Sequence, residues 1–106
     1  LTSKFKIITN NLEEIISPHE IGFNIINPTD IYGGNTVEEA ATKFINILKT
    51  NELNNQSNVA IVNAAYAIKC INSKLSINEA INIAKESLLS GNAYKCFKQL
   101  INLNNN

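Results

Sequence analysis

Hydrophobic and polar residues follow two different patterns along this 106-residue chain. Lys4–Ile8 and Leu12–Ile16 are short β-prone runs on either side of Asn10-Asn11. Two such runs around an Asn-rich turn predict a β-hairpin. From Thr36 onward the apolar residues recur with a helical period instead.

Two Pro-containing segments lie between these parts. Ser17-Pro18-His19-Glu20 is either a single helical turn, opened by Pro18 and capped by Ser17, or a plain turn, and Gly22 would end the helical form. Asn27–Asp30 predicts a second short turn of the same kind, which we expect Gly33-Gly34 to stop.

The first long helix is expected from Thr36 to about Thr50, with Thr36 and Glu39 as a capping box. The apolar residues of this segment share one helix face and are Val37, Ala40, Ala41, Phe44, Ile45 and Leu48. A second helix, Ser57–Ile71, has almost no polar face, and such a helix belongs in the middle of a protein.

A third helix is predicted to begin at Ser76, again with a capping box to Glu79, and to end before Gly91. Its apolar stripe consists of Ile77, Ala80, Ile81, Ala84 and Leu88. The fourth helix, Asn92–Leu103, is expected to bury Tyr94, Phe97, Leu100 and Ile101, with a frayed tail at 104–106. The fold class expected of residues 1–106 is therefore α+β, an N-terminal hairpin followed by about four helices.

Composition limits the class of protein and of partner. The formal net charge is zero, which argues against a nucleic acid or an anionic membrane surface as a binding partner. The chain contains no run of about 18 apolar residues, which is the length needed to span a membrane. The chain starts at Leu1, contains no Met and opens without the apolar core of a signal peptide, so we expect it to be a piece of a longer protein.

The two cysteines, Cys70 and Cys96, show no CxxC spacing and have no paired His nearby for a metal site. Both fall within predicted helices. We expect them to be reduced, in a cytoplasmic protein.

Few residues could carry chemistry. His19 is the only histidine and is expected to be a solvated turn residue. Gly33–Thr36 could cradle a phosphate at a helix start, but it lacks the spacing of known phosphate loops, so a turn that feeds a helix cap is the favoured interpretation. The adjacent pairs Glu13-Glu14 and Glu38-Glu39 point apart rather than across a substrate.

Asn63 and Tyr66 interrupt the apolar second helix. A buried Asn usually has a hydrogen-bond partner and serves packing, and contact with a ligand is the less favoured alternative. We therefore assign no catalytic, cofactor-binding or metal-binding residue.

Three stretches of the chain resemble the C-terminal end of the anthranilate phosphoribosyltransferases. They are the Gly-Gly turn and acidic helix start Gly33–Ala41, the apolar helix Val59–Ala67 with its Asn-Ala-Ala core, and the Ser-Gly-x-Ala helix break within Ala84–Ala93. Ser17–Phe23 is similar to the family's Pro-Glu-Asp-Phe-Gly turn, from which His19 and Ile21 depart. Leu1-Thr2 resembles the strand start that follows the family's acidic metal-binding pair.

The resemblance implies a parent enzyme with a helical domain and a mostly parallel α/β domain. Such enzymes transfer a 5-phosphoribosyl group from phosphoribosyl pyrophosphate to anthranilate in tryptophan biosynthesis, with Mg²⁺ on the leaving diphosphate. The family's Gly-rich phosphate loop, Lys-His-Gly-Asn segment and acidic pair are absent from this sequence, so no catalytic residue carries over.

The resemblance predicts a structural C-terminal segment, 1–106, that is inactive alone and has the remainder of the parent chain as its partner. No cofactor is expected in the segment itself. The alternative is a free-standing, non-catalytic helical interaction module. Self-association through exposed apolar surface is compatible with either hypothesis.

Overall fold

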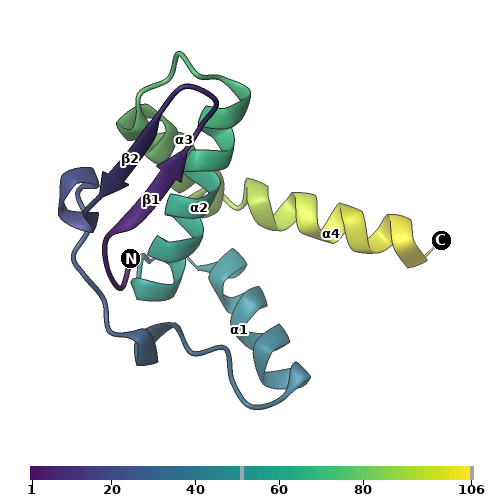
Figure 1. The fold of residues 1–106 in the computed structure, drawn as a ribbon. Helices are drawn as coiled ribbons and strands as arrows, with labels where there is room; N and C mark the ends of the chain where they lie inside the picture. The colour runs from purple at the N-terminus through teal and green to yellow at the C-terminus, as the bar shows by residue number, and fades with distance from the viewer. Residues whose placement is uncertain (51, 106) are drawn as a thin grey trace. The chain divides into compact units, whose positions relative to one another are not determined.

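A computed structural model describes residues 1–50 and 52–105, and these residues divide into two compact units, Leu1–Tyr32 and Gly33–Asn106. The first unit contains two strands and two short 3-10 turns, and the second contains four α-helices. Figure 1 shows the order of these elements along the chain. The α+β fold class predicted from the hydrophobic pattern is confirmed.

The hairpin of the first unit consists of β1 (Phe5–Ile8) and β2 (Glu13–Ile16), which pair antiparallel with Phe5 opposite Ile16 and Ile8 opposite Glu13. The Thr9 N–H donates to the Leu12 carbonyl at 2.8 Å and closes the turn. Phe5 and Ile7 are half-buried, whereas Lys6 and Ile8 are exposed. Strand β1 thus shows the side-chain alternation with a period of two that is typical of strands, while in β2 only Ile16 is partly buried.

The two Pro segments both form 3-10 turns, η1 (Pro18–Ile21) and η2 (Pro28–Ile31). Gly22 ends η1 with φ +86°, which favours glycine, but the Ser17 side chain forms no cap hydrogen bond. In η2 the Asn27 side chain accepts from the Thr29 N–H at 3.1 Å. This second turn ends at Ile31, before the Gly-Gly pair that was expected to stop it.

The buried residues of the first unit come mainly from the segment around η1. They are Pro18, Ile21, Phe23 and Ile26. Backbone hydrogen bonds hold this segment, because the Phe23 N–H donates to the Pro18 carbonyl at 3.0 Å and the Ile26 N–H donates to the Leu1 carbonyl at 3.2 Å.

The second unit consists of α1 (Val37–Lys49), α2 (Asn55–Ile71), α3 (Ile77–Leu89) and α4 (Asn92–Asn105). Helices α2 and α3 pack closely against each other. Among the described residues of this unit, the buried ones lie on these two helices and are Ser57, Ile61, Val62, Ala65, Ala80, Ile81, Ala84 and Leu88. Except for half-buried Ile77, the predicted stripe of α3 is therefore buried.

Side-chain caps begin three of the helices. Thr36 and Ser76 accept from the N–H groups of Glu39 and Glu79, both at 3.1 Å, which is one half of each predicted capping box. A complete capping box starts α2 two residues earlier than expected. There the Asn54 carboxamide accepts from the Ser57 N–H at 2.9 Å, and the Ser57 Oγ accepts from the Asn54 N–H at 2.8 Å.

The predicted burial of α2 and α4 is wrong in part. Helix α2 is buried along one side only, and its Ala60, Ala64 and Ala67 are exposed. Leu100 and Ile101 of α4, expected in the core, are 56% and 39% exposed. Helical period predicts which residues share a face, but burial also requires a neighbouring element that covers this face.

Helix α4 continues to Asn105, beyond the predicted end at Leu103, and the expected fraying of Asn106 lies outside the described residues. None of the helices in the described part of the chain is long and apolar enough to cross a membrane.

Candidate functional site

The loop before α1 is the segment most similar to a phosphate cradle, and its geometry is that of a helix cap. Gly34 has φ +98°, and a Cβ added there would lie 2.7 Å from the Glu39 Cβ. The Asn35 N–H donates to Glu39 Oε2 at 2.6 Å. The Glu39 carboxylate thus accepts from a loop N–H group that a bound phosphate would otherwise use, which favours the structural interpretation of Gly33–Thr36.

His19 lies on η1 with an exposed side chain, and its neighbour Glu20 is exposed as well. In residues 1–50 and 52–105, no three side chains of His, Cys, Asp or Glu come together as metal ligands would. The described residues therefore offer no set of three or more such side chains that could together hold a metal ion.

The two adjacent carboxylate pairs are surface residues, and each has an identifiable structural role. Lys6 Nζ of β1 and Glu13 Oε1 of β2 form an ion pair at 2.7 Å, and both side chains are at least half exposed. Such an exposed pair contributes only about 0–1 kcal/mol. Glu38 and Glu39 lie in the first turn of α1, where negative charge suits the helix dipole.

Asn63 is exposed, so its predicted burial is wrong. Its Nδ2 donates to the Val59 carbonyl, one turn earlier on α2, at 2.9 Å. This bond satisfies the amide within its own helix. Tyr66 is half-buried on the same helix. Cys70 and Cys96 are free and exposed, on α2 and α4 respectively.

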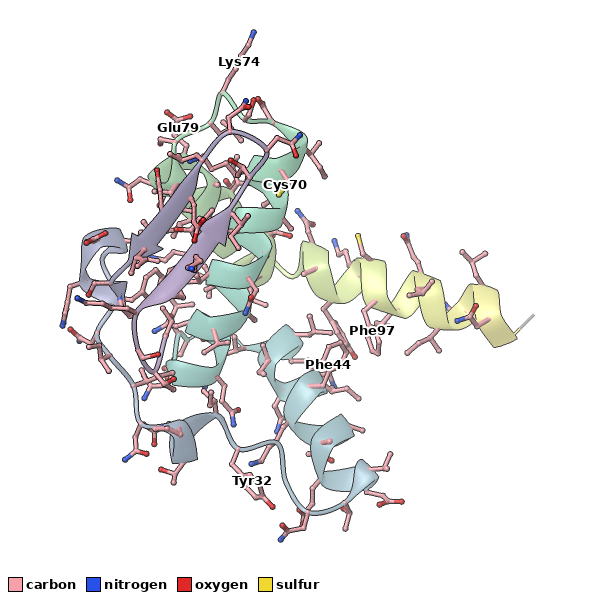
Figure 2. The ribbon with its side chains drawn as sticks, viewed as in Figure 1. Tyr32, Phe44, Cys70, Lys74, Glu79 and Phe97 are labelled. Atoms are coloured by element: carbon pink, nitrogen blue, oxygen red, sulfur yellow. The ribbon has the colours of Figure 1, made fainter. Side chains whose placement is uncertain are left out.

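A group of aromatic and charged side chains lies where α1 meets α4, and the sequence pattern did not single it out. The rings of Phe44 and Phe97 meet edge to face, with centroids 5.1 Å apart and planes at 73° (Figure 2). Lys49 Nζ and Lys98 Nζ lie 5.4 and 5.5 Å from the centroid of the Tyr94 ring. We call these five residues the α1–α4 cluster.

The α1–α4 cluster offers aromatic rings and ammonium groups for a binding contact, but it contains no evident catalytic group. Cation–π contacts of this kind contribute about 0.5–1 kcal/mol each at exposed sites, and an edge-to-face ring pair contributes about 0.5–1.5 kcal/mol. The helical spacing of Tyr94 and Phe97 was a usable signal for one face of α4. The proximity of Lys49 to that face depends on the α1–α4 contact, which no local pattern specifies.

Comparison with known proteins identifies several anthranilate phosphoribosyltransferases as relatives of this chain. The chain is 43% identical to the anthranilate phosphoribosyltransferase of Bacteroides thetaiotaomicron, over 99% of this chain. It is 39% identical to that of Phocaeicola vulgatus over 98% of its length, and 40% identical to that of Christiangramia forsetii over 100%. The chain spans only 31–32% of the length of these curated relatives. No family model matches the chain, and no solved structure matches it significantly.

Proposed function

We propose that this chain, which corresponds in sequence to a region of the anthranilate phosphoribosyltransferases, serves as the C-terminal structural part of such an enzyme. The observation that carries the proposal is near-complete coverage of this chain at 39–43% identity, combined with coverage of about a third of each relative. The complete enzyme would transfer a 5-phosphoribosyl group from phosphoribosyl pyrophosphate to anthranilate and release pyrophosphate, in the cytoplasm.

The isolated chain is inactive under this proposal. Transfer of a phosphoribosyl group requires a phosphate-binding loop and carboxylates that hold the Mg²⁺ of the leaving diphosphate. The described residues contain no cluster of metal-ligand side chains, and the Gly33–Thr36 loop is capped by Glu39. Substrate binding and metal binding are therefore assigned to the remainder of the enzyme, and the present residues support them.

The direct test is an assay of the purified 106-residue chain with phosphoribosyl pyrophosphate, anthranilate and Mg²⁺. Loss of anthranilate fluorescence reports turnover. We expect no loss above the rate without protein, and the B. thetaiotaomicron relative serves as the positive control. Turnover by the 106-residue chain alone would contradict the assignment of the chemistry to the remainder of the enzyme.

A second candidate function is a free-standing helical interaction module. One observation favours it: α1 has no buried residue and exposes Val37 and Phe44, at 81% and 50%. Large exposed apolar surfaces usually mark interfaces. This candidate predicts that the chain does not restore phosphoribosyl transfer when it is joined to the rest of a relative, whereas the first candidate predicts that it does.

A further inference from the structure

The apolar faces of α1 and α4 extend well beyond the point at which the two helices touch. Beyond the Phe44–Phe97 contact, α4 runs away from α1, as Figure 2 shows. On α4, Leu100 and Ile101 continue the face of Phe97 and are exposed. On α1, Val37 continues the face of Phe44 and is 81% exposed. Two apolar helix faces thus diverge from one aromatic contact without covering each other.

Positive charge borders this surface on one side. Lys49 and Lys98 approach the Tyr94 ring from α1 and α4, so two ammonium groups share one aromatic ring. Within the described residues, neither lysine has a carboxylate oxygen within 4.0 Å of its Nζ. A carboxylate from a covering segment would pair with both charges and would offset their mutual repulsion.

The segment that best explains these uncovered faces of α1 and α4 belongs to the same polypeptide in a complete enzyme. The curated relatives are about three times as long as the present chain, which covers 31–32% of them. A segment joined covalently to its docking surface has a high effective concentration, so it outcompetes a separate protein of similar complementarity. A second copy of the chain is the competing occupant.

We propose that the diverging faces of α1 and α4 form the surface on which the rest of the enzyme packs, through an apolar segment with a carboxylate opposite Lys49 and Lys98. This inference rests on the proposed function and adds the location and chemistry of the contact. The occupied surface consists of Val37, Phe44, Tyr94, Phe97, Leu100 and Ile101, with the two lysines at its border.

The test compares the isolated chain with a chimera in which it replaces the region that it matches in the B. thetaiotaomicron relative. Hydrogen exchange measured by mass spectrometry reports how well the amides of α1 and α4 are protected in each protein. Leu100→Asp and Gln99→Asp, introduced into the chimera, form a matched pair. Both place the same charge on α4, but only Leu100 lies on the proposed surface, while Gln99 is exposed on the opposite face.

We expect the amides of α1 and α4 to exchange at least about tenfold more slowly in the chimera, which corresponds to about 1.4 kcal/mol of added protection. We also expect Leu100→Asp to lower the midpoint of thermal unfolding of the chimera, whereas Gln99→Asp leaves it nearly unchanged. Lys49→Glu should lower this midpoint as well, because it removes the proposed pairing and introduces repulsion.

Equal exchange in the isolated chain and the chimera would overturn the proposal, and so would equal tolerance of the two aspartates. Self-association of the isolated chain that Leu100→Asp abolishes, together with unchanged exchange in the chimera, would assign the surface to a second copy. Turnover by the chimera tests the proposed function separately. An active chimera with unprotected α1 and α4 refutes only the present inference, while a folded but inactive chimera refutes the proposed function.

Discussion

Replacement of Gly34 by Ala tests the interpretation of the Gly33–Thr36 loop as a cap rather than an anion site. Gly34 has φ +98°, and its added Cβ would lie 2.7 Å from the Glu39 Cβ, closer than real Cβ contacts. The left-handed conformation alone costs a residue with a Cβ about 1–2 kcal/mol. The close contact must be relieved by movement of Glu39, which loosens the hydrogen bond from the Asn35 N–H. Because that bond is exposed, its loss adds only about 0.5–1.5 kcal/mol.

Together these two costs destabilise the first turn of α1 locally by about 1.5–3.5 kcal/mol. Helix α1 has no buried residue, so this turn can open without unfolding of α2 and α3. Hydrogen exchange followed by NMR is the suitable assay, at the Ala40 amide, which donates to the Thr36 carbonyl at 3.1 Å. A change of about 2 kcal/mol should speed its exchange roughly thirtyfold, up to the limit set by the intrinsic rate.

Gly33→Ala is the matched control. Its Cβ would meet no atom within 4 Å, and its φ lies outside the left-handed region. This substitution should leave the exchange of Ala40 unchanged or slow it slightly, because Ala restricts the unfolded chain. If Gly34→Ala accelerates the exchange of Ala40 no more than Gly33→Ala does, the cap does not require glycine at position 34.

Two further substitutions test the packing and the capping of α2 and α3. Ala80→Leu should lower the free energy of unfolding by about 1–3 kcal/mol in urea titrations, because Ala80 is 0% exposed and a larger side chain overpacks its site. Ala67→Leu, on the exposed side of α2, is the control and should change the free energy of unfolding little. An equal effect of both would mean that the Ala80 site is not tightly packed. Ser57→Ala should cost about 1–2 kcal/mol in the same titration, since it removes a 0% exposed hydroxyl that bonds to the Asn54 backbone. A change near zero would show that the Ser57 hydroxyl adds nothing to the capping box.

Local sequence signals were sufficient for the order and type of the elements. Alternation and the Asn-rich turn predicted the hairpin, Pro18 and Pro28 predicted the two short turns, and helical period predicted α1 to α4. These signals act within a few residues, as do the caps at Thr36 and Ser76. The earlier start of α2 had a readable signal too, since Asn54 and Ser57 stand three residues apart as in a capping box.

Burial was less predictable because it depends on more than the element itself. The stripe of α3 was predicted well, since α2 lies against it in this chain. The similar stripes of α1 and α4 are only partly covered, and Leu100 remains exposed. The α1–α4 cluster was missed for the same reason, because Lys49 reaches Tyr94 only through the contact between two helices that are distant in sequence.

The activity of the joined enzyme tests most directly whether residues 1–106 serve as the C-terminal part of such a transferase. The chimera that carries residues 1–106 in place of the matching region of the B. thetaiotaomicron relative is assayed with phosphoribosyl pyrophosphate, anthranilate and Mg²⁺. We expect the chimera to consume anthranilate, and we expect no consumption by the 106-residue chain or by the relative's remaining two thirds when each is assayed alone. A folded chimera of the same size as the relative that consumes no anthranilate would refute this assignment of residues 1–106.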